Sequence, residues 1–156
     1  MDQKKAWMTR AIELSKKNIE NGGGPFGAVI VHQGKVVGEG VNRVTANNDP
    51  TAHAEVVAIR QACQTLKTFD LSECEIFTSC EPCPMCLSAI YWAHLSKVYY
   101  GNTKQDAAHI KFDDEFIYQE IPKRPQDRKI PMSQLSRDEA LKAFEIWEKK
   151  SDKIIY

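Results

Sequence analysis

The sequence has no long apolar run and no excess of charge of either sign. Its 156 residues include 21 lysines and arginines and 21 aspartates and glutamates, so the formal charge at pH 7 is zero. No run of lysine or arginine exceeds two residues, which argues against a polyphosphate partner such as a nucleic acid. No apolar stretch approaches the roughly 20 residues that a membrane-spanning helix needs. We therefore expect neither nucleic-acid binding nor membrane insertion.

The amino terminus and the cysteines indicate a reducing compartment. The first residues, from Met1 to Trp7, lack the apolar core of a secretory signal. The five cysteines are an odd number, which does not suit a framework of paired disulfides. We expect them to be thiols or metal ligands in the cytoplasm. At this length the chain is expected to form one domain over residues 1–156.

Helical and extended patterns follow one another and predict an α/β protein. Apolar residues at helical spacing, including Ile12 and Ile19, predict a helix over 2–21, which the glycines and proline of 22–25 end. Strands are predicted over 26–31 and 35–41, joined as a hairpin. Residues 42–48 are polar and expected to be irregular. There follow a helix over 52–66, a strand over 75–79, a helix over 81–93 and a strand over 97–101. This order favours parallel pairing of the later strands.

The pattern is weaker after Gly101. A short helix is predicted to start near 113–118, and three prolines between 122 and 131 mark an extended, charged segment. Ser136 and Glu139 have the spacing of a capping box, which predicts the start of a last helix with an apolar stripe. The chain ends on Ile154-Ile155-Tyr156, an apolar tail that we expect to dock against protein.

Two short motifs supply the chemistry of a metal site. His53 is followed two residues later by Glu55, and a Pro-Cys-x-x-Cys motif supplies Cys83 and Cys86. One histidine and two cysteines leave the fourth corner of a zinc tetrahedron to water, which is typical of catalytic sites. Zinc lowers the pKa of bound water to about 7, so hydroxide is available at neutral pH. Glu55 is then the carboxylate expected to move protons.

The spacing of His53 and Glu55 favours a site at the start of a helix. Residues two apart lie roughly 200° apart around a helix axis, so these side chains can converge only at a helix end. Asp49 and Pro50 are predicted to be the N-cap and the first residue of that helix. The two thiols are expected in the first turn of the next helix, where backbone N–H groups and the helix dipole favour thiolate.

Each of these residues also has a simpler interpretation. His53 could be a core histidine, Glu55 a solvent-facing carboxylate, and the Cys-x-x-Cys motif a redox pair. A redox pair needs no His-x-Glu motif, so the joint pattern favours zinc. Cys80 offers a third thiol three residues before Cys83. The order Pro-Cys selects Cys83 and Cys86 as ligands, and Cys80 is expected to be a buried neighbour.

Four segments resemble the bacterial guanine deaminases, a branch of the cytidine and deoxycytidylate deaminase superfamily. They are residues 24–28, 47–55, 78–86 and 112–114. The zinc motifs are specific for the superfamily, and the Phe-Asp-Asp segment and the Ile-Tyr end narrow the resemblance towards guanine. The resemblance implies a three-layer α/β/α sandwich with a cytidine-deaminase-like, five-stranded mixed sheet. It also implies a homodimer that keeps residues 1–121 as the zinc core and exchanges 122–156 between subunits.

The resemblance further implies the reaction and its residues. One zinc per subunit would be held by His53, Cys83 and Cys86, with Glu55 as proton shuttle and Asp114 as a second catalytic residue. Hydroxide on zinc would attack C2 of guanine, giving xanthine and ammonia. The residues implied to contact the purine are Phe26, Asn42, Ala54, Trp92, Asp114 and Tyr156.

The implied substrate residues also have structural interpretations. Asn42 could end a strand, and Asp114 could cap a helix. Phe26 and Trp92 could be core aromatics. Tyr156 lies at a terminus, and chain termini usually fray.

Three functions stay open on the sequence. The first is hydrolysis of guanine. The second is deamination of guanosine, cytosine or another amino-azine, including adenosine in tRNA, although a neutral chain disfavours a polyphosphate substrate. The third is a zinc-stabilised binding protein without catalysis, which the presence of Glu55 beside a complete ligand set disfavours.

Overall fold

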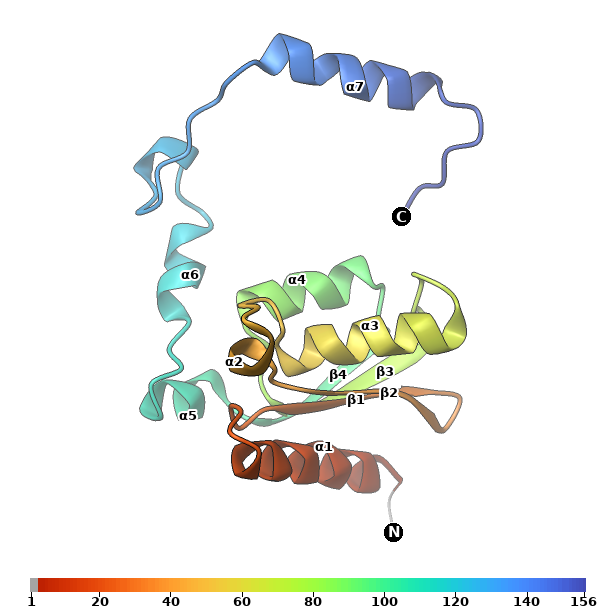
Figure 1. The fold of residues 1–156 in the computed structure, drawn as a ribbon, viewed down its shortest axis with the longest axis vertical. Coiled ribbons are helices and arrows are strands. Elements are labelled where there is room, and N and C mark those ends of the chain that lie inside the picture. Colours follow the sequence, from red (N-terminus) through yellow and green to blue (C-terminus); the bar gives the residue numbers. More distant parts are fainter. Residues whose placement is uncertain (1–2) are drawn as a thin grey trace. The chain divides into compact units, whose positions relative to one another are not determined.

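The structure is a computed structural model that describes residues 3–156. The chain divides into two compact units, the first ending at Asp114 and the second running from Glu115 to Tyr156. The first unit contains a mixed β-sheet with helices on both faces, and the second contains helices joined by extended chain (Figure 1). The α/β class predicted from the sequence is confirmed in the first unit.

The sheet has the strand order β2-β1-β3-β4. Strand β1 (Gly27–His32) pairs antiparallel with both β2 (Lys35–Val41) and β3 (Cys74–Cys80). Strand β3 pairs parallel with β4 (Lys97–Asn102). The predicted hairpin and the predicted parallel pair are therefore both present.

The expectation of a five-stranded sheet is wrong for the described chain, whose sheet has four strands. After β4 the chain forms α5 (Lys104–His109), α6 (Glu115–Glu120) and the 3-10 helix η1 (Pro125–Asp127). The extended residues that follow η1 pair with no strand. Strand β4 is therefore an edge strand of the described sheet.

Successive side chains of β1 point to opposite faces of the sheet, and an apolar layer lies on each face. Val29 and Val31 face α1 (Gln3–Glu20) together with Phe77, and Ala28 and Ile30 face the opposite side. On that side lie α3 (Ala54–Leu66) and α4 (Pro84–Trp92), so the sheet lies between helices (Figure 1). The predicted three-layer α/β/α arrangement is confirmed.

Glycines on β2 determine how closely α3 approaches the sheet. A Cβ on Gly40 would lie 2.0 Å from the carbonyl oxygen of Ala54, and one on Gly38 would lie 2.5 Å from that of Ala58. Alanines form the facing side of the helix and are fully buried. With no side chain in between, the start of α3 is held in one position against the sheet.

Helix α1 is close to its predicted range, and its apolar stripe, predicted to include Ala11 and Ser15 as well as Ile12 and Ile19, is confirmed in part. Ile12 and Ile19 are 36% and 55% exposed. A Cβ on Gly27 would lie 2.4 Å from the carbonyl oxygen of Ala11, so the helix and strand touch through small residues. The buried residues of α1 are Ala11, Ser15 and Asn18.

The start of α3 differs from its prediction by one turn. The helix begins at Ala54 with His53 as its N-cap, rather than after Asp49. The Asp49 carboxylate instead accepts hydrogen bonds from the backbone N–H of Thr51 at 2.9 Å and from its hydroxyl at 2.7 Å. Residues 42–48, expected to be irregular, include the short helix α2 (Val44–Asn47).

The last helix, α7 (Arg137–Lys149), lacks the predicted capping box. Ser136 has a left-handed backbone (φ 50°) and its side chain makes no capping hydrogen bond. An N-cap residue normally has an extended backbone, which points its oxygen at the first turn. A capping box occurs instead at α5, between Thr103 and Asp106, where the sequence had not been assigned a helix.

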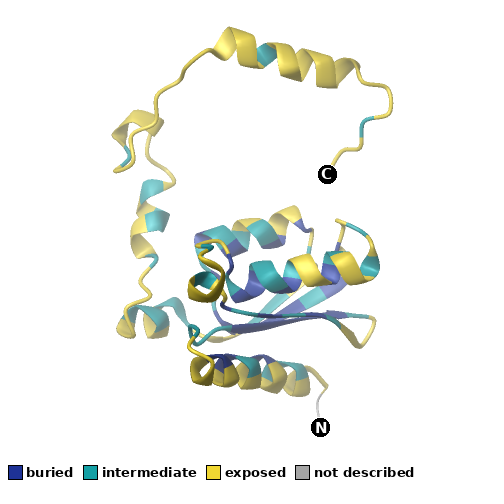
Figure 2. Cartoon of the chain, viewed as in Figure 1, coloured by how far each residue is buried: buried dark blue, intermediate teal, exposed yellow. Residues whose placement is uncertain are grey.

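The second unit has no buried core of its own. No residue from 115 to 156 is buried (Figure 2). Phe144 on α7 is 76% exposed, and the terminal Ile155 and Tyr156 are exposed as well. Among residues 3–156, no helix is both long enough and apolar enough to cross a membrane.

Candidate metal centre and active site

Two helix N-termini bring one histidine and two cysteines together. His53 is the N-cap of α3, Cys83 is the N-cap of α4, and Cys86 lies in the first turn of α4. His53 Nδ1 lies 3.5 Å from the Sγ atoms of both Cys83 and Cys86. The three ligand atoms lie within 4.8 Å of one another. The site is thus at helix starts, as the two-residue spacing of His53 and Glu55 predicted.

The spacing of these donors suits tetrahedral zinc. A zinc ion about 2.0 Å from nitrogen and 2.3 Å from sulfur would place the nitrogen and sulfur donors about 3.5 Å apart, and the observed distances are 3.5 Å. This trio is the metal-capable group found among the described residues. Cys80 is outside it, with its Sγ 3.7 Å from the carbonyl oxygen of Thr103. Three protein donors match the catalytic rather than the structural pattern of zinc ligation.

The two thiols influence each other's protonation. The pKa of Cys83 is lowered to about 4, chiefly because the Cys86 thiol donates a hydrogen bond to its thiolate. The pKa of Cys86 is raised by that same bond and by burial. The pKa of His53 is raised, first by its hydrogen bond with Cys83. A dication would favour loss of the remaining thiol proton as well.

Glu55 is a buried carboxylate in the first turn of α3, with 6% of its surface exposed. Burial raises its pKa. Its Oε1 accepts a hydrogen bond from the hydroxyl of Thr78 on β3 at 3.3 Å. A carboxyl group whose pKa is raised towards neutrality is suited to accept and return a proton. Thr78 was not singled out from the sequence, although its place in a strand that ends at the Cys motif was a usable signal.

An aromatic contact connects the Phe26 segment with the Phe-Asp-Asp segment. The rings of Phe26 and Phe112 lie 5.0 Å apart, edge to face at 89°. Asp114 is half-buried, and its pKa is raised first by burial and also by the Cys83 thiolate. Phe112 was not among the predicted site residues, although it belongs to a segment on which the family resemblance depended.

Asn42 is buried and its side chain has a defined orientation. Its backbone N–H donates to the carbonyl oxygen of Phe26 at 3.2 Å. Its side-chain Oδ1 accepts from the backbone N–H of Val44 at 3.3 Å. This bond orients the amide, and its NH2 group is a donor that Asn42 can offer to a ligand.

The remaining predicted site residues differ in their surroundings. Ala54, between His53 and Glu55, is fully buried. Trp92 ends α4 and is 65% exposed. Tyr156 belongs to the second unit.

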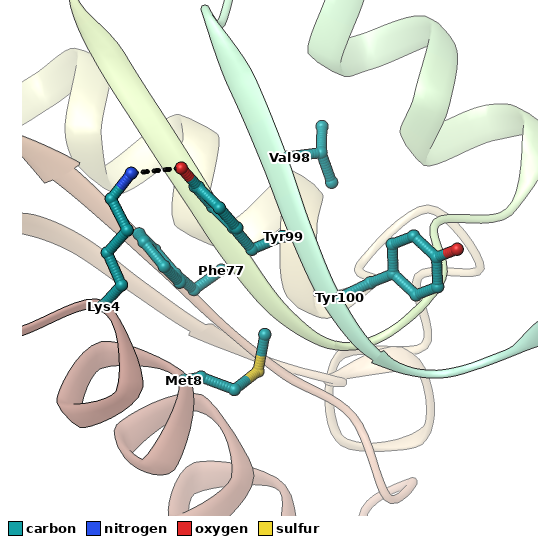
Figure 3. Close-up of a pocket in the computed structure, with 6 residues that line it drawn as sticks. All are labelled: Lys4, Met8, Phe77, Val98, Tyr99 and Tyr100. Atoms are coloured by element: carbon teal, nitrogen blue, oxygen red, sulfur yellow. Dashed lines mark hydrogen bonds between the residues drawn. The ribbon is translucent and has the colours of Figure 1, made fainter. Parts of the chain in front are cut away.

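A separate hollow of about 330 Å³ lies along the edge strand β4 (Figure 3). The Tyr99 ring stacks on Phe77 with centroids 4.6 Å apart, and its hydroxyl is hydrogen-bonded to Lys4. The hollow contains none of the metal-capable trio. It is an aromatic surface beside an unpaired strand edge, and it is lined by Lys4, Met8, Phe77, Val98, Tyr99 and Tyr100.

Comparison with known proteins agrees with this geometry. The cytidine and deoxycytidylate deaminase zinc-binding region matches residues 1–102. Guanine deaminase of Bacillus subtilis is 50% identical over 151 residues, which is 96% of this chain and 97% of that protein. Its X-ray structure superposes with a TM-score of 0.95 at 49% identity, covering 97% of this chain and 98% of the other.

Two further relatives are more distant. Guanine deaminase from Nitrosomonas europaea has a TM-score of 0.69 at 32% identity, covering 81% of this chain and 69% of that one. A tRNA-specific adenosine deaminase of Buchnera aphidicola is 36% identical over 100 residues, which is 64% of this chain and 66% of that protein. The chain therefore belongs to the cytidine and deoxycytidylate deaminase zinc-binding family, and its full-length similarity is to the guanine deaminases.

Proposed function

We propose that this protein hydrolyses guanine to xanthine and ammonia, with one zinc ion per subunit held by His53, Cys83 and Cys86. The supporting observation is a His/Cys/Cys trio of tetrahedral spacing in which His53 caps the same helix, α3, whose first turn carries the buried carboxylate of Glu55. Full-length identity of 50% to a guanine deaminase supports guanine as the substrate. The described chain has five free cysteines and no disulfide, which supports a location in the reducing cytoplasm.

Proton transfer is assigned to carboxyl groups of the chain. Zinc, when bound, supplies a water that loses its proton near neutral pH. Glu55 accepts that proton and returns it to the amino group that leaves from C2. The Thr78 hydroxyl lies 3.3 Å from Oε1 of Glu55 and 3.0 Å from the carbonyl oxygen of Cys80, so its single hydrogen is shared between these two acceptors. Asp114, whose pKa is raised by burial, is proposed as the second proton carrier.

Purine recognition is assigned to the groups around the Phe26 segment. The NH2 group of Asn42 donates to an acceptor on the purine edge, and the carboxyl of Asp114 accepts from its N–H groups. Phe26, fixed by Phe112, provides a wall for the ring. The residues proposed to complete the pocket are Ala54, Trp92 and Tyr156.

We also propose a homodimer that exchanges residues 122–156. The second unit buries no residue, and α7 exposes Phe144 and Trp147 on an apolar stripe. The first unit has an unpaired strand edge at β4 with an aromatic hollow beside it. An apolar helix without a core and an uncovered sheet edge complement each other when two copies associate.

The reaction is tested by an ammonia-release screen over free bases and nucleosides, with metal analysis of the same sample. We expect turnover of guanine, weak or no turnover of guanosine, and about one zinc per chain. Ammonia release from cytosine or from adenosine in tRNA, with none from guanine, would overturn the assignment of guanine as the substrate. Bound zinc without ammonia from any base would favour a binding protein.

The ligand set is tested by two cysteine substitutions. Cys83→Ala removes one of three donors and is expected to lose zinc against a chelator that the wild type resists. Cys80→Ala is the matched control, because its buried thiol lies outside the trio, and it should keep zinc. Equal zinc loss in both variants would place Cys80 among the ligands.

A further inference from the structure

Asn18 is a buried polar residue in the last turn of α1, with 4% of its surface exposed. Its side-chain NH2 donates to the carbonyl oxygen of Gly24 at 2.8 Å and to that of Asn42 at 2.9 Å. Both hydrogens of the amide are therefore used, on two segments 18 residues apart in sequence. These are the segments that present Phe26 and Asn42.

Gly23 and Gly24 lie close to the Asn18, Phe26 and Asn42 side chains, so little room is left for a side chain at either glycine. A Cβ on Gly23 would lie 2.3 Å from Asn18 Nδ2, so a side chain there would displace the amide. A Cβ on Gly24 would lie 3.3 Å from Asn42 Cγ and 3.3 Å from Phe26 Cδ2. Gly24 thus lies against both side chains that we assign to purine binding, and Asn18 holds its carbonyl.

We propose that Asn18 is a positioning residue for the purine, because its amide ties the Phe26 segment to Asn42 and so sets the distance between ring wall and amide donor. The inference rests on the proposed deamination of guanine and deepens it. Asn18 touches no metal-capable residue and lies on a helix that packs against the face of the sheet opposite α3 and α4. Its loss should therefore weaken the hold on substrate and leave the metal centre intact.

The test compares two variants at Asn18 with a control on the same helix. Asn18→Ala removes both hydrogen bonds, and Asn18→Asp keeps the shape but has no hydrogens to donate when ionised. Ser15→Ala is the control, since Ser15 is also buried on α1 and its hydroxyl donates only to the carbonyl oxygen of Ile12, at 2.7 Å. KM, kcat, zinc per chain and melting temperature are measured for each.

We expect KM for guanine to rise about tenfold or more in both Asn18 variants, with a smaller change in kcat and unchanged zinc. Ser15→Ala should lower the melting temperature without moving KM. Gly24→Ala, which crowds Phe26 and Asn42 while leaving Asn18 in place, should also raise KM.

Two outcomes would overturn the inference. One is a lowered melting temperature with wild-type KM in both Asn18 variants. The other is failure of both variants to fold while Ser15→Ala folds, which would make Asn18 a folding residue only. If the wild type deaminates a base other than guanine, the substrate assignment fails, and the same KM comparison is made on that base. If no base is deaminated, the positioning role fails together with the proposed function.

Discussion

Residues 3–114 and 115–156 use apolar side chains in opposite ways. The first unit buries them in two layers on either side of a sheet, and this packing holds two helix starts where His53, Cys83 and Cys86 meet. The second unit has an amphipathic helix and an apolar end but buries nothing within itself. The reactive groups are thus held by a local core, whereas the apolar side chains of residues 115–156 are not covered within that segment.

The largest expected effect is at the buried carboxylate of the first unit. Glu55→Gln keeps the size of the side chain and the hydrogen bond with Thr78 but cannot accept and return a proton. We expect kcat for guanine to fall by about 10²–10⁴-fold, the range for loss of general acid–base catalysis. Ammonia release and zinc content are measured together, and zinc should stay at the wild-type level.

Glu81→Gln is the matched control for this change. Glu81 lies close to the cysteine motif, but its Oε2 accepts from the backbone N–H of Lys104 at 2.9 Å, a bond that glutamine can also accept. Activity near the wild-type level is expected. Equal loss of kcat in both variants would mean that Glu55 is not the specific proton carrier.

The next effect concerns the apolar stripe of the second unit. Phe144→Asp places a charge on this stripe and is expected to shift the protein from dimer to monomer, as measured by light scattering over a dilution series. Lys142→Asp is the control, because Lys142 lies on the opposite, polar side of α7. A wild-type protein that is already monomeric would contradict the exchange of 122–156 and would leave the exposed stripe without its proposed partner.

A smaller effect on stability is expected from the N-caps of two helices, α5 in the first unit and α7 in the second. Thr103 caps α5 by accepting from the backbone N–H of Asp106, whereas the side chain of Ser136 makes no cap at α7. Thr103→Ala should lower the free energy of unfolding by about 1 kcal/mol. Ser136→Ala should leave it nearly unchanged in the same denaturant titration. The reverse order would mean that α7 is capped in solution.

The smallest effect is a pH dependence at the same capping box. The backbone N–H and hydroxyl of Thr103 donate to the Asp106 carboxylate, which lowers the pKa of Asp106 below its ordinary value of 3.8. A lowered folded pKa stabilises the folded state above the ordinary pKa, and this contribution is lost as pH falls through the folded value. The melting-temperature difference between wild type and Asp106→Ala should be full near neutral pH and should shrink in acid. A constant difference would exclude the ionised cap as its cause.

Much of the first unit could be predicted because local patterns agreed with the tertiary contacts. The β-hairpin, the parallel β3–β4 pair and the long helices follow from strand and helix periodicity. The site was also predictable in outline, since His53 and Glu55 can converge only at a helix start. This requirement follows from the geometry of the helix and does not depend on which residues pack around it.

Other features depended on contacts that the sequence pattern does not show. Asp49 is a residue type common at N-caps, but it accepts hydrogen bonds within its own turn, and α3 starts at Ala54, where the helix packs against Gly40. Ser136 and Glu139 have capping-box spacing, but the left-handed backbone of Ser136 prevents the bond.

The reactive residue types, their spacing and the order of the main strands and helices can be read from the sequence, because they follow from covalent chemistry and local backbone preference. The three-dimensional structure was needed to show that Asn18 joins the Phe26 and Asn42 segments, that Thr78 reaches Glu55, and that the described sheet has four strands. These are contacts between residues far apart in sequence. Their formation depends on which faces pack together, and a local pattern does not specify that.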